Sequence, residues 1–254
     1  MNLLTIVRDA FADEVDGLGR ISRVLTQADV FTMLNAIAGL VGVFAVAVGE
    51  FKVAAAIIAL SVVLDGVDGI AARLWGGGPL GPFLDTLADL LSFGILPAVL
   101  LAVGLPGLHG VGFAFGALWL IASMLRLARF EVLREPSKPR YYSGMTTTGA
   151  AVLLGAFFLA DVDPWITAAW AGILAVWMVS RIRTVKLTFW PLMAGAATLF
   201  PTFIDLIVPL PRTYVLVSLF TGMALYTFVG PFYILGKYGP TPNPKDQDPH
   251  AEAP

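Results

Sequence analysis

The sequence contains no cysteine, and histidine occurs only at His109 and His250. The absence of cysteine excludes disulfides, thiolate metal sites and cysteine nucleophiles. The two histidines lie in a short Gly/Pro loop and in the C-terminal segment, which leaves little scope for histidine-based catalysis. Any chemistry must therefore use carboxylates, arginine and lysine, hydroxyl groups and bound ions.

Charged residues are also scarce. They make up 13% of the 254 residues, while 57% are hydrophobic, and a soluble domain is normally about a quarter charged. This composition predicts an integral membrane protein. The formal net charge of −2 gives no indication of a nucleic-acid partner.

Long apolar runs predict an all-α, polytopic bundle of about eight transmembrane helices. The expected spans are residues 30–49, 53–74, 83–104, 111–133, 146–161, 164–180, 189–208 and 213–236.

The flanking segments differ from these runs. Residues 1–28 carry apolar residues at helical spacing interrupted by charges, which favours an amphipathic helix on the membrane surface over a cleavable signal peptide. Residues 239–254 are polar and rich in proline, and we expect a disordered tail. The membrane domain is therefore expected over residues 29–238.

The basic residues indicate an orientation. With eight spans, both termini share a side with the loops around 75–82, 134–145 and 181–188, and that side collects fourteen of the sixteen basic residues. The positive-inside rule then places both termini in the cytoplasm of a cell-membrane protein.

Four aspartates lie near the cytoplasmic ends of the second and third spans. Asp65 and Asp68 are three residues apart, and Asp85 and Asp89 are four apart, so each pair shares one helix face. Because the two helices are antiparallel neighbours, all four carboxylates are expected to meet at one depth near the cytoplasmic surface.

Clustered carboxylates repel one another unless cations neutralise them. Oxygen ligands without histidine or cysteine suit Mg²⁺ or Mn²⁺, and two such ions can serve a phosphoryl displacement. The alternative is a structural role, in which the aspartates pair with Arg73, Arg126 and Arg129. Ionisable groups within membranes are functional by default, which favours the metal site.

The motif around these aspartates resembles that of the CDP-alcohol phosphotransferases. Its fixed positions are Asp65, Asp68, Gly69, Ala72 and Arg73, then seven residues, then Gly81, Asp85 and Asp89. The resemblance implies transfer of a phosphatidyl-type group from a CDP-linked lipid to an alcohol, with release of CMP.

The same resemblance implies roles for individual residues. Asp65, Asp68, Asp85 and Asp89 would bind two Mg²⁺ or Mn²⁺ ions, and Asp89 would also act as the general base. Gly69, Ala72 and Gly81 would border the nucleotide. Arg73 would contact phosphates or carboxylates of the site, or serve only as an interfacial anchor.

The acceptor alcohol is indicated by Leu90. Family members with phosphorylated acceptors carry a cation after the last aspartate, whereas this chain has leucine. The stretches LDTLADLLSFGILPA, LRLARFEV and FTMLNAIAG resemble phosphatidylserine synthases, although YYSGMTTTGAA departs from their usual pattern. L-serine is therefore the expected acceptor, with CDP-diacylglycerol or CDP-archaeol as the donor.

Three further polar residues are candidates for ligand contacts. Arg126 and Arg129 share a face near the cytoplasmic end of the fourth span and suit a diphosphate or a carboxylate; membrane anchoring is the alternative. Asn35, in the cytoplasmic half of the first span, could hydrogen-bond the nucleotide or a neighbouring helix.

Two other functions remain open at this stage. The acceptor could be glycerol phosphate or inositol phosphate instead of serine. The carboxylates could also belong to an ion- or proton-coupled transporter, although such groups usually lie near the midplane on repeated, broken helices. The family resemblance further suggests a homodimer surrounded by membrane lipids.

Overall fold

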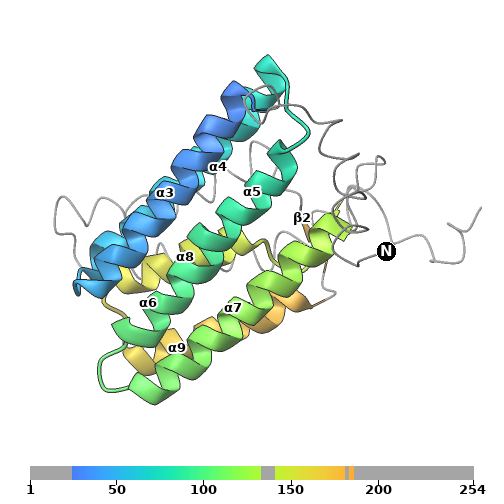
Figure 1. Cartoon of the computed structure of the whole chain (residues 1–254). Coiled ribbons are helices and arrows are strands. Elements are labelled where there is room, and N and C mark those ends of the chain that lie inside the picture. Colours follow the sequence, from blue (N-terminus) through green and yellow to red (C-terminus); the bar gives the residue numbers. More distant parts are fainter. Residues whose placement is uncertain (1–24, 133–140, 181–182, 186–254) are drawn as a thin grey trace, which may run out of the picture.

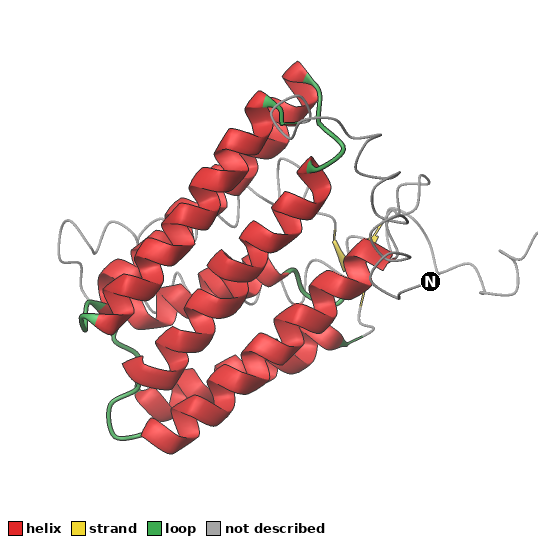
Figure 2. Cartoon of the chain, viewed as in Figure 1, coloured by secondary structure: helices red, strands yellow, loops and turns green. Residues whose placement is uncertain are grey.

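The computed structural model describes residues 25–132, 141–180 and 183–185, and almost all of this part of the chain is helical (Figures 1 and 2). The helices are α3 (Gln27–Ala47), α4 (Phe51–Trp75), α5 (Gly81–Asp89), η1 (Leu90–Ile95, a π-helix), α6 (Leu96–Gly104), α7 (His109–Val132), α8 (Thr147–Leu159) and α9 (Pro164–Val179). Two three-residue strands, β1 (Tyr141–Ser143) and β2 (Arg183–Val185), pair antiparallel.

Four helical stretches are long and apolar enough to cross a membrane: Gln27–Ala47, Phe51–Trp75, Gly81–Gly104 and Gly110–Val132. The third combines α5, η1 and α6. α8 and α9 are apolar but shorter, with 13 and 16 residues. These spans identify the chain as an integral membrane protein.

The helices agree with the first six predicted spans to within a few residues at each end. The predicted spans at 189–208 and 213–236 and the tail at 239–254 lie outside the described residues, as does the predicted interfacial segment apart from its last four residues. The total of eight spans therefore stays a prediction.

Small residues line several helix contacts inside the bundle, where they allow close packing within a membrane. α4 packs on α8 in this way: Ala54, Ala55, Ala150 and Ala151 are buried, and a Cβ on Gly155 would lie 3.3 Å from the Ala55 carbonyl oxygen. Large apolar side chains such as Phe44, Val63 and Phe113 point outward instead, as expected for a surface that faces lipid.

Figure 1 shows that the beginning of α3, the end of α4 and the beginning of α5 lie at the same end of the bundle. At Gly76, which has a φ of +86°, the chain leaves α4 in a conformation that favours glycine. At the other end of α4, Lys52 forms a 2.6 Å ion pair with Asp161, in the turn between α8 and α9.

Candidate metal centre and active site

Three of the predicted aspartates meet at the end where α4 finishes and α5 begins. Asp65, Asp68 and Asp85 each offer a carboxylate oxygen, and these three oxygens lie within 4.8 Å of one another. Asp68 is buried, and the other two are half-buried. The short connection between the antiparallel helices α4 and α5 brings the two halves of the motif together.

Asp89 lies one turn beyond Asp85 on α5, next to this group. It interacts electrostatically with the other three motif aspartates and with the Arg126 guanidinium. Its Oδ1 is buried and has no hydrogen-bond partner among the described residues. A buried carboxylate oxygen without a donor is costly, so a bound cation or substrate hydroxyl would suit this position.

Helix α3 contributes two residues that the sequence analysis did not identify. Thr32 Oγ1 donates a 2.8 Å hydrogen bond to Asp68 Oδ2, which fixes the orientation of this carboxylate. Asp29 is buried at the start of α3, where its Oδ2 accepts from Thr26 N at 2.6 Å and Thr26 Oγ1 at 2.9 Å.

The other oxygen of Asp29 faces α5. A Cβ built on Gly81 would lie 3.1 Å from Asp29 Oδ1, so the first residue of α5 packs directly against this carboxylate. Two sequence signals could have pointed to these residues. Thr26-x-x-Asp29 is a recognisable helix-start pattern, and Thr32 lies one helical turn before the candidate Asn35. Only the fold, however, shows which neighbours Asp29 and Thr32 contact.

Gly66 and Gly69, on the aspartate-bearing part of α4, border open space, unlike Gly81. A Cβ on Gly66 would have no neighbour within 4 Å, and one on Gly69 would reach only Arg73 Nη1, at 4.0 Å. Arg73 itself is exposed, and Ala72 is half-buried. The last two turns of α4 therefore leave room for a ligand beside the aspartates.

The two arginines of α7 have different surroundings. Arg126 is buried, lies 5.4 Å from the centroid of the Phe130 ring, and interacts electrostatically with Asp89. Arg129 donates to the end of α9: Nη1 to Val179 O at 3.0 Å, and Nη2 to Met178 O at 3.1 Å. Both nitrogens also lie 3.3 Å from Ser180 O. Arg129 thus satisfies carbonyl groups that a helix end leaves unpaired.

Two further polar groups lie on neighbouring helices. The Asn35 side chain is 1% exposed, and neither of its amide atoms has a hydrogen-bond partner in the described part of the chain. Thr86 Oγ1 lies 3.1 Å from Pro82 O and 3.4 Å from Glu131 Oε2, so Glu131 of α7 approaches the motif helix α5. Glu131 was not among the predicted site residues.

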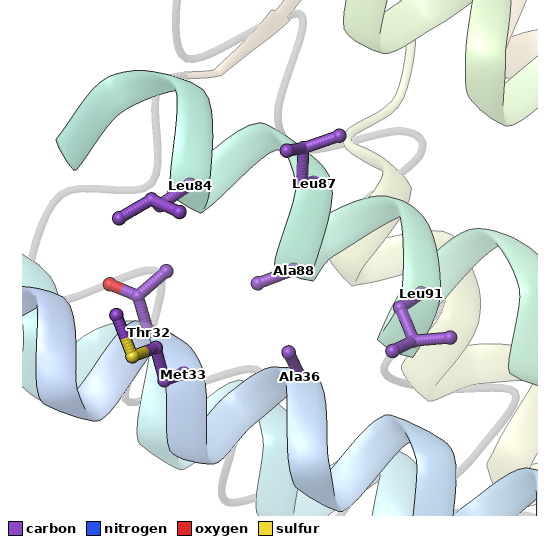
Figure 3. A pocket seen from close by; sticks show the side chains of 7 residues that line it. All are labelled: Thr32, Met33, Ala36, Leu84, Leu87, Ala88 and Leu91. Atoms are coloured by element: carbon purple, nitrogen blue, oxygen red, sulfur yellow. The ribbon is translucent and has the colours of Figure 1, made fainter. Parts of the chain in front are cut away.

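An apolar groove of about 220 Å³ runs between α3 and the α5–η1 segment. Figure 3 shows Thr32, Met33 and Ala36 on one side, and the other side is formed by Leu84, Leu87, Ala88 and Leu91. Thr32 both lines this groove and hydrogen-bonds Asp68. The polar cluster is thus directly continuous with an apolar surface.

The donor set fits a hard divalent cation. Asp65, Asp68 and Asp85 supply only oxygen atoms, which suit Mg²⁺ and Mn²⁺, and the uncrowded glycines leave space for a phosphate-bearing ligand beside them. The fold and this cluster together define a helical membrane protein with an acidic cluster, able to hold a metal ion, at one end of its spans.

Comparison with known proteins identifies the family. The sequence model described as CDP-alcohol phosphatidyltransferase matches residues 25–182, which contain every described helix and the complete aspartate motif. The chain belongs to the CDP-alcohol phosphatidyltransferase family.

Curated relatives include three proteins with informative names. Archaetidylserine synthase of Methanothermobacter thermautotrophicus is 30% identical over 168 residues, which cover 65% of this chain and 71% of the relative. CDP-diacylglycerol–serine O-phosphatidyltransferase of Mycobacterium leprae is 33% identical, covering 61% of this chain and 57% of the relative. The Helicobacter pylori protein of that name is 30% identical, covering 61% and 70%.

Proposed function

We propose that this enzyme transfers a phosphatidyl or archaetidyl group from a CDP-lipid to L-serine, which releases CMP and forms a serine phospholipid. The observation that carries the proposal is the convergence of Asp65, Asp68 and Asp85 to within 4.8 Å inside the region that matches the family. The names of the relatives support serine as the acceptor.

In this proposal Asp65, Asp68, Asp85 and Asp89 hold two divalent cations, Mg²⁺ or Mn²⁺. When bound, such ions neutralise the diphosphate and stabilise the charge that develops during phosphoryl transfer. Bound cations would offset the cost of four neighbouring carboxylates at the end of a membrane helix and would allow an anionic diphosphate to approach them.

Asp89 is the proposed general base. It accepts the proton of the serine hydroxyl while the hydroxyl oxygen attacks the β-phosphorus of the CDP-lipid. The new P–O bond joins serine to the lipid phosphate, and the bond to the CMP phosphate breaks. The unpaired, buried Oδ1 of Asp89 supports this role.

The remaining predicted residues have binding roles in the proposal. Gly69, Ala72 and Gly81 border the nucleotide, and the open space beside Gly69 supports this. Arg73 contacts phosphate at the exposed rim, and the buried amide of Asn35 offers hydrogen bonds to the nucleotide. Arg126, which interacts electrostatically with Asp89, contacts phosphate or the serine carboxylate, whereas Arg129 donates hydrogen bonds to the end of α9.

The absence of a lysine or arginine directly after Asp89 supports serine over a phosphorylated acceptor. Leu90 occupies this position and begins η1.

In the same proposal the membrane domain spans residues 29–238, the termini and the active site face the cytoplasm, and two copies form a homodimer. The distribution of basic residues supports this orientation.

The test is CMP release by the purified protein with CDP-diacylglycerol or CDP-archaeol and Mn²⁺ or Mg²⁺, with and without L-serine. Serine-dependent release that EDTA abolishes is the expected result. Release only with glycerol phosphate or inositol phosphate would overturn the choice of acceptor and keep the metal site. No release with any acceptor on both donors would overturn the transferase and favour the transporter.

A further inference from the structure

The span that carries Asp85 and Asp89 is a continuous helix with an irregular centre. α5 ends at Asp89, six residues of π-helix follow, and α6 continues to Gly104. Within this segment Leu96 N donates to Leu91 O, five residues back instead of four. A π-segment inside a helix is rare and frequently lies at functional sites; here it begins directly after the proposed base.

Pro97 adds a second irregularity. Proline has no backbone N–H, so Pro97 cannot donate to Phe93 O, the carbonyl four residues before it. In the interior of a membrane protein no bulk water replaces the missing donor. The Phe93 carbonyl therefore lacks its regular α-helical partner and can accept from a neighbouring helix.

Trp119 of α7 supplies such a donor. Its indole Nε1 donates a 3.1 Å hydrogen bond to Phe93 O, and the side chain is fully buried. The two helices are in close contact around this bond: a Cβ on Gly116 would collide with Ala98 O, and one on Gly94 would lie 3.4 Å from Ser123 Cβ. The bond thus joins the irregular segment to a tightly packed neighbour.

The same face of α7 reaches the active site. Trp119, Ser123 and Arg126 follow at spacings of four and three residues, which places them along one side of the helix, and all three are buried. Arg126 interacts electrostatically with Asp89. Ser92 Oγ, also in the π-segment, donates to Asn35 O at 2.9 Å, which holds this segment against α3.

We propose that Trp119 is a positioning residue: through its hydrogen bond to the π-segment it sets the axial register of α7, so that Arg126 faces Asp89 at the distance that the transfer requires. This inference rests on the proposed function. It extends that proposal to a residue two turns away from the site, which no part of the motif contains.

The experiment compares Trp119→Phe, which keeps an apolar ring and removes the donor, with Trp119→Phe combined with Pro97→Ala. The alanine supplies a backbone N–H four residues after Phe93 and can satisfy its carbonyl without α7. Trp165→Phe is the matched control, because Trp165 is exposed on α9. The measurements are kcat, KM for the CDP-lipid, the metal concentration for half-maximal activity, and the thermal unfolding midpoint in detergent.

We expect Trp119→Phe to lower kcat by about 10- to 100-fold, as small misplacements of catalytic groups do. The half-maximal metal concentration stays within about twofold, because Asp65, Asp68 and Asp85 lie on α4 and α5 outside this contact, and the unfolding midpoint falls. The double variant recovers the midpoint but not kcat, because the link to α7 stays broken.

Recovery of kcat together with the midpoint would overturn the proposal, since Trp119 would then act through stability alone. An unchanged kcat in Trp119→Phe would overturn it as well. Failure of the proposed function is distinguishable from both results, because the unsubstituted protein and Trp165→Phe would then release no CMP with any acceptor.

Discussion

The carboxylates of the metal centre have distinct surroundings, although all belong to one motif. Asp68 receives a hydrogen bond from Thr32, whereas Asp89 has a buried oxygen without a donor from the described residues. An oriented carboxylate suits a metal ligand, and an oxygen with free acceptor capacity suits a base or a shared ligand. Two predictions follow from this difference.

Replacement of Asp89 by asparagine should lower serine-dependent CMP release by about 10²- to 10⁴-fold, the usual contribution of a general base. Asparagine keeps the size of the side chain but cannot accept the proton of the serine hydroxyl. The matched control is Asp163→Asn, at the first turn of α9, where the carboxylate accepts from Trp165 N at 2.9 Å. Asparagine is as good a helix cap as aspartate, so this variant should keep its activity.

Loss of activity in Asp163→Asn equal to that in Asp89→Asn would contradict the assignment, because it would show a general sensitivity to lost charge. The acidic residues at the α8–α9 turn thus have structural roles of their own: Asp161 pairs with Lys52, and Asp163 caps α9.

Thr32→Val should raise the Mn²⁺ or Mg²⁺ concentration for half-maximal activity by about 10- to 100-fold, as loss of a group that orients a metal ligand typically does. Valine keeps the shape of threonine and removes the hydroxyl that fixes Asp68. Thr32→Ser restores the hydroxyl and should restore the metal dependence. A metal titration of Thr32→Val that overlays the unsubstituted enzyme would refute the role of Thr32.

The sequence predicts the four aspartates but not Thr32 and Asp29, which contact the motif from α3, and the reason is physical. Asp65, Asp68, Asp85 and Asp89 follow fixed helical spacing within one antiparallel pair, so local geometry alone brings them together. Thr32 and Asp29 meet the motif only because α3 packs against α4 and α5. Contacts of this kind depend on tertiary packing, which helical spacing within one segment does not encode.

At the scale of elements, hydropathy predicted where the described spans lie but not their internal irregularities. The third span was expected as one regular helix over 83–104, whereas it contains the π-segment Leu90–Ile95. Pro97 was visible in the sequence, and its missing N–H disrupts regular bonding. The donor to the Phe93 carbonyl, on Trp119, lies 26 positions after Phe93 in the chain.

Arg129 provides the prediction at this scale, because it joins the end of α7 to the end of α9. Arg129→Met should lower the free energy of unfolding by about 1–3 kcal/mol, since it removes charged donors from the partly buried carbonyl groups at the end of α9. Lysine should not restore the loss, because it lacks the planar fork that reaches several carbonyl groups at once. Thermal or denaturant unfolding in detergent measures the effect.

Arg126→Met is the matched comparison, and it should reduce turnover more than Arg129→Met does at a temperature where both variants are folded. The opposite order, with unchanged stability and a large loss of turnover in Arg129→Met, would place Arg129 in the ligand site after all.

At the scale of the whole molecule, the position of the site fits an enzyme that joins a lipid to a water-soluble acceptor. The cluster lies at the end of the spans, where polar substrates arrive from water, and the groove beside Thr32 is apolar. A carboxylate-based transporter would instead place its acidic groups near the middle of the membrane. The location of the cluster along the spans therefore favours the transferase.

The orientation of the molecule can be measured directly, because the chain has no cysteine of its own and each introduced cysteine is a unique label site. Gly77 lies in the α4–α5 connection beside the aspartates, and Glu50 and Gly110 lie at the other ends of α4 and α7. All three residues are exposed, and a Cβ would collide with nothing at Gly77 or Gly110. The excess of basic residues on the side of Gly77 predicts that this side is cytoplasmic.

In intact cells a membrane-impermeant maleimide should therefore label Glu50→Cys and Gly110→Cys, and should label Gly77→Cys only after permeabilisation. Labelling of Gly77→Cys in intact cells, with protection of the other two, would place the metal centre on the outer face, away from cytoplasmic serine and CDP-lipid, and would refute both the orientation and the proposed supply of substrate.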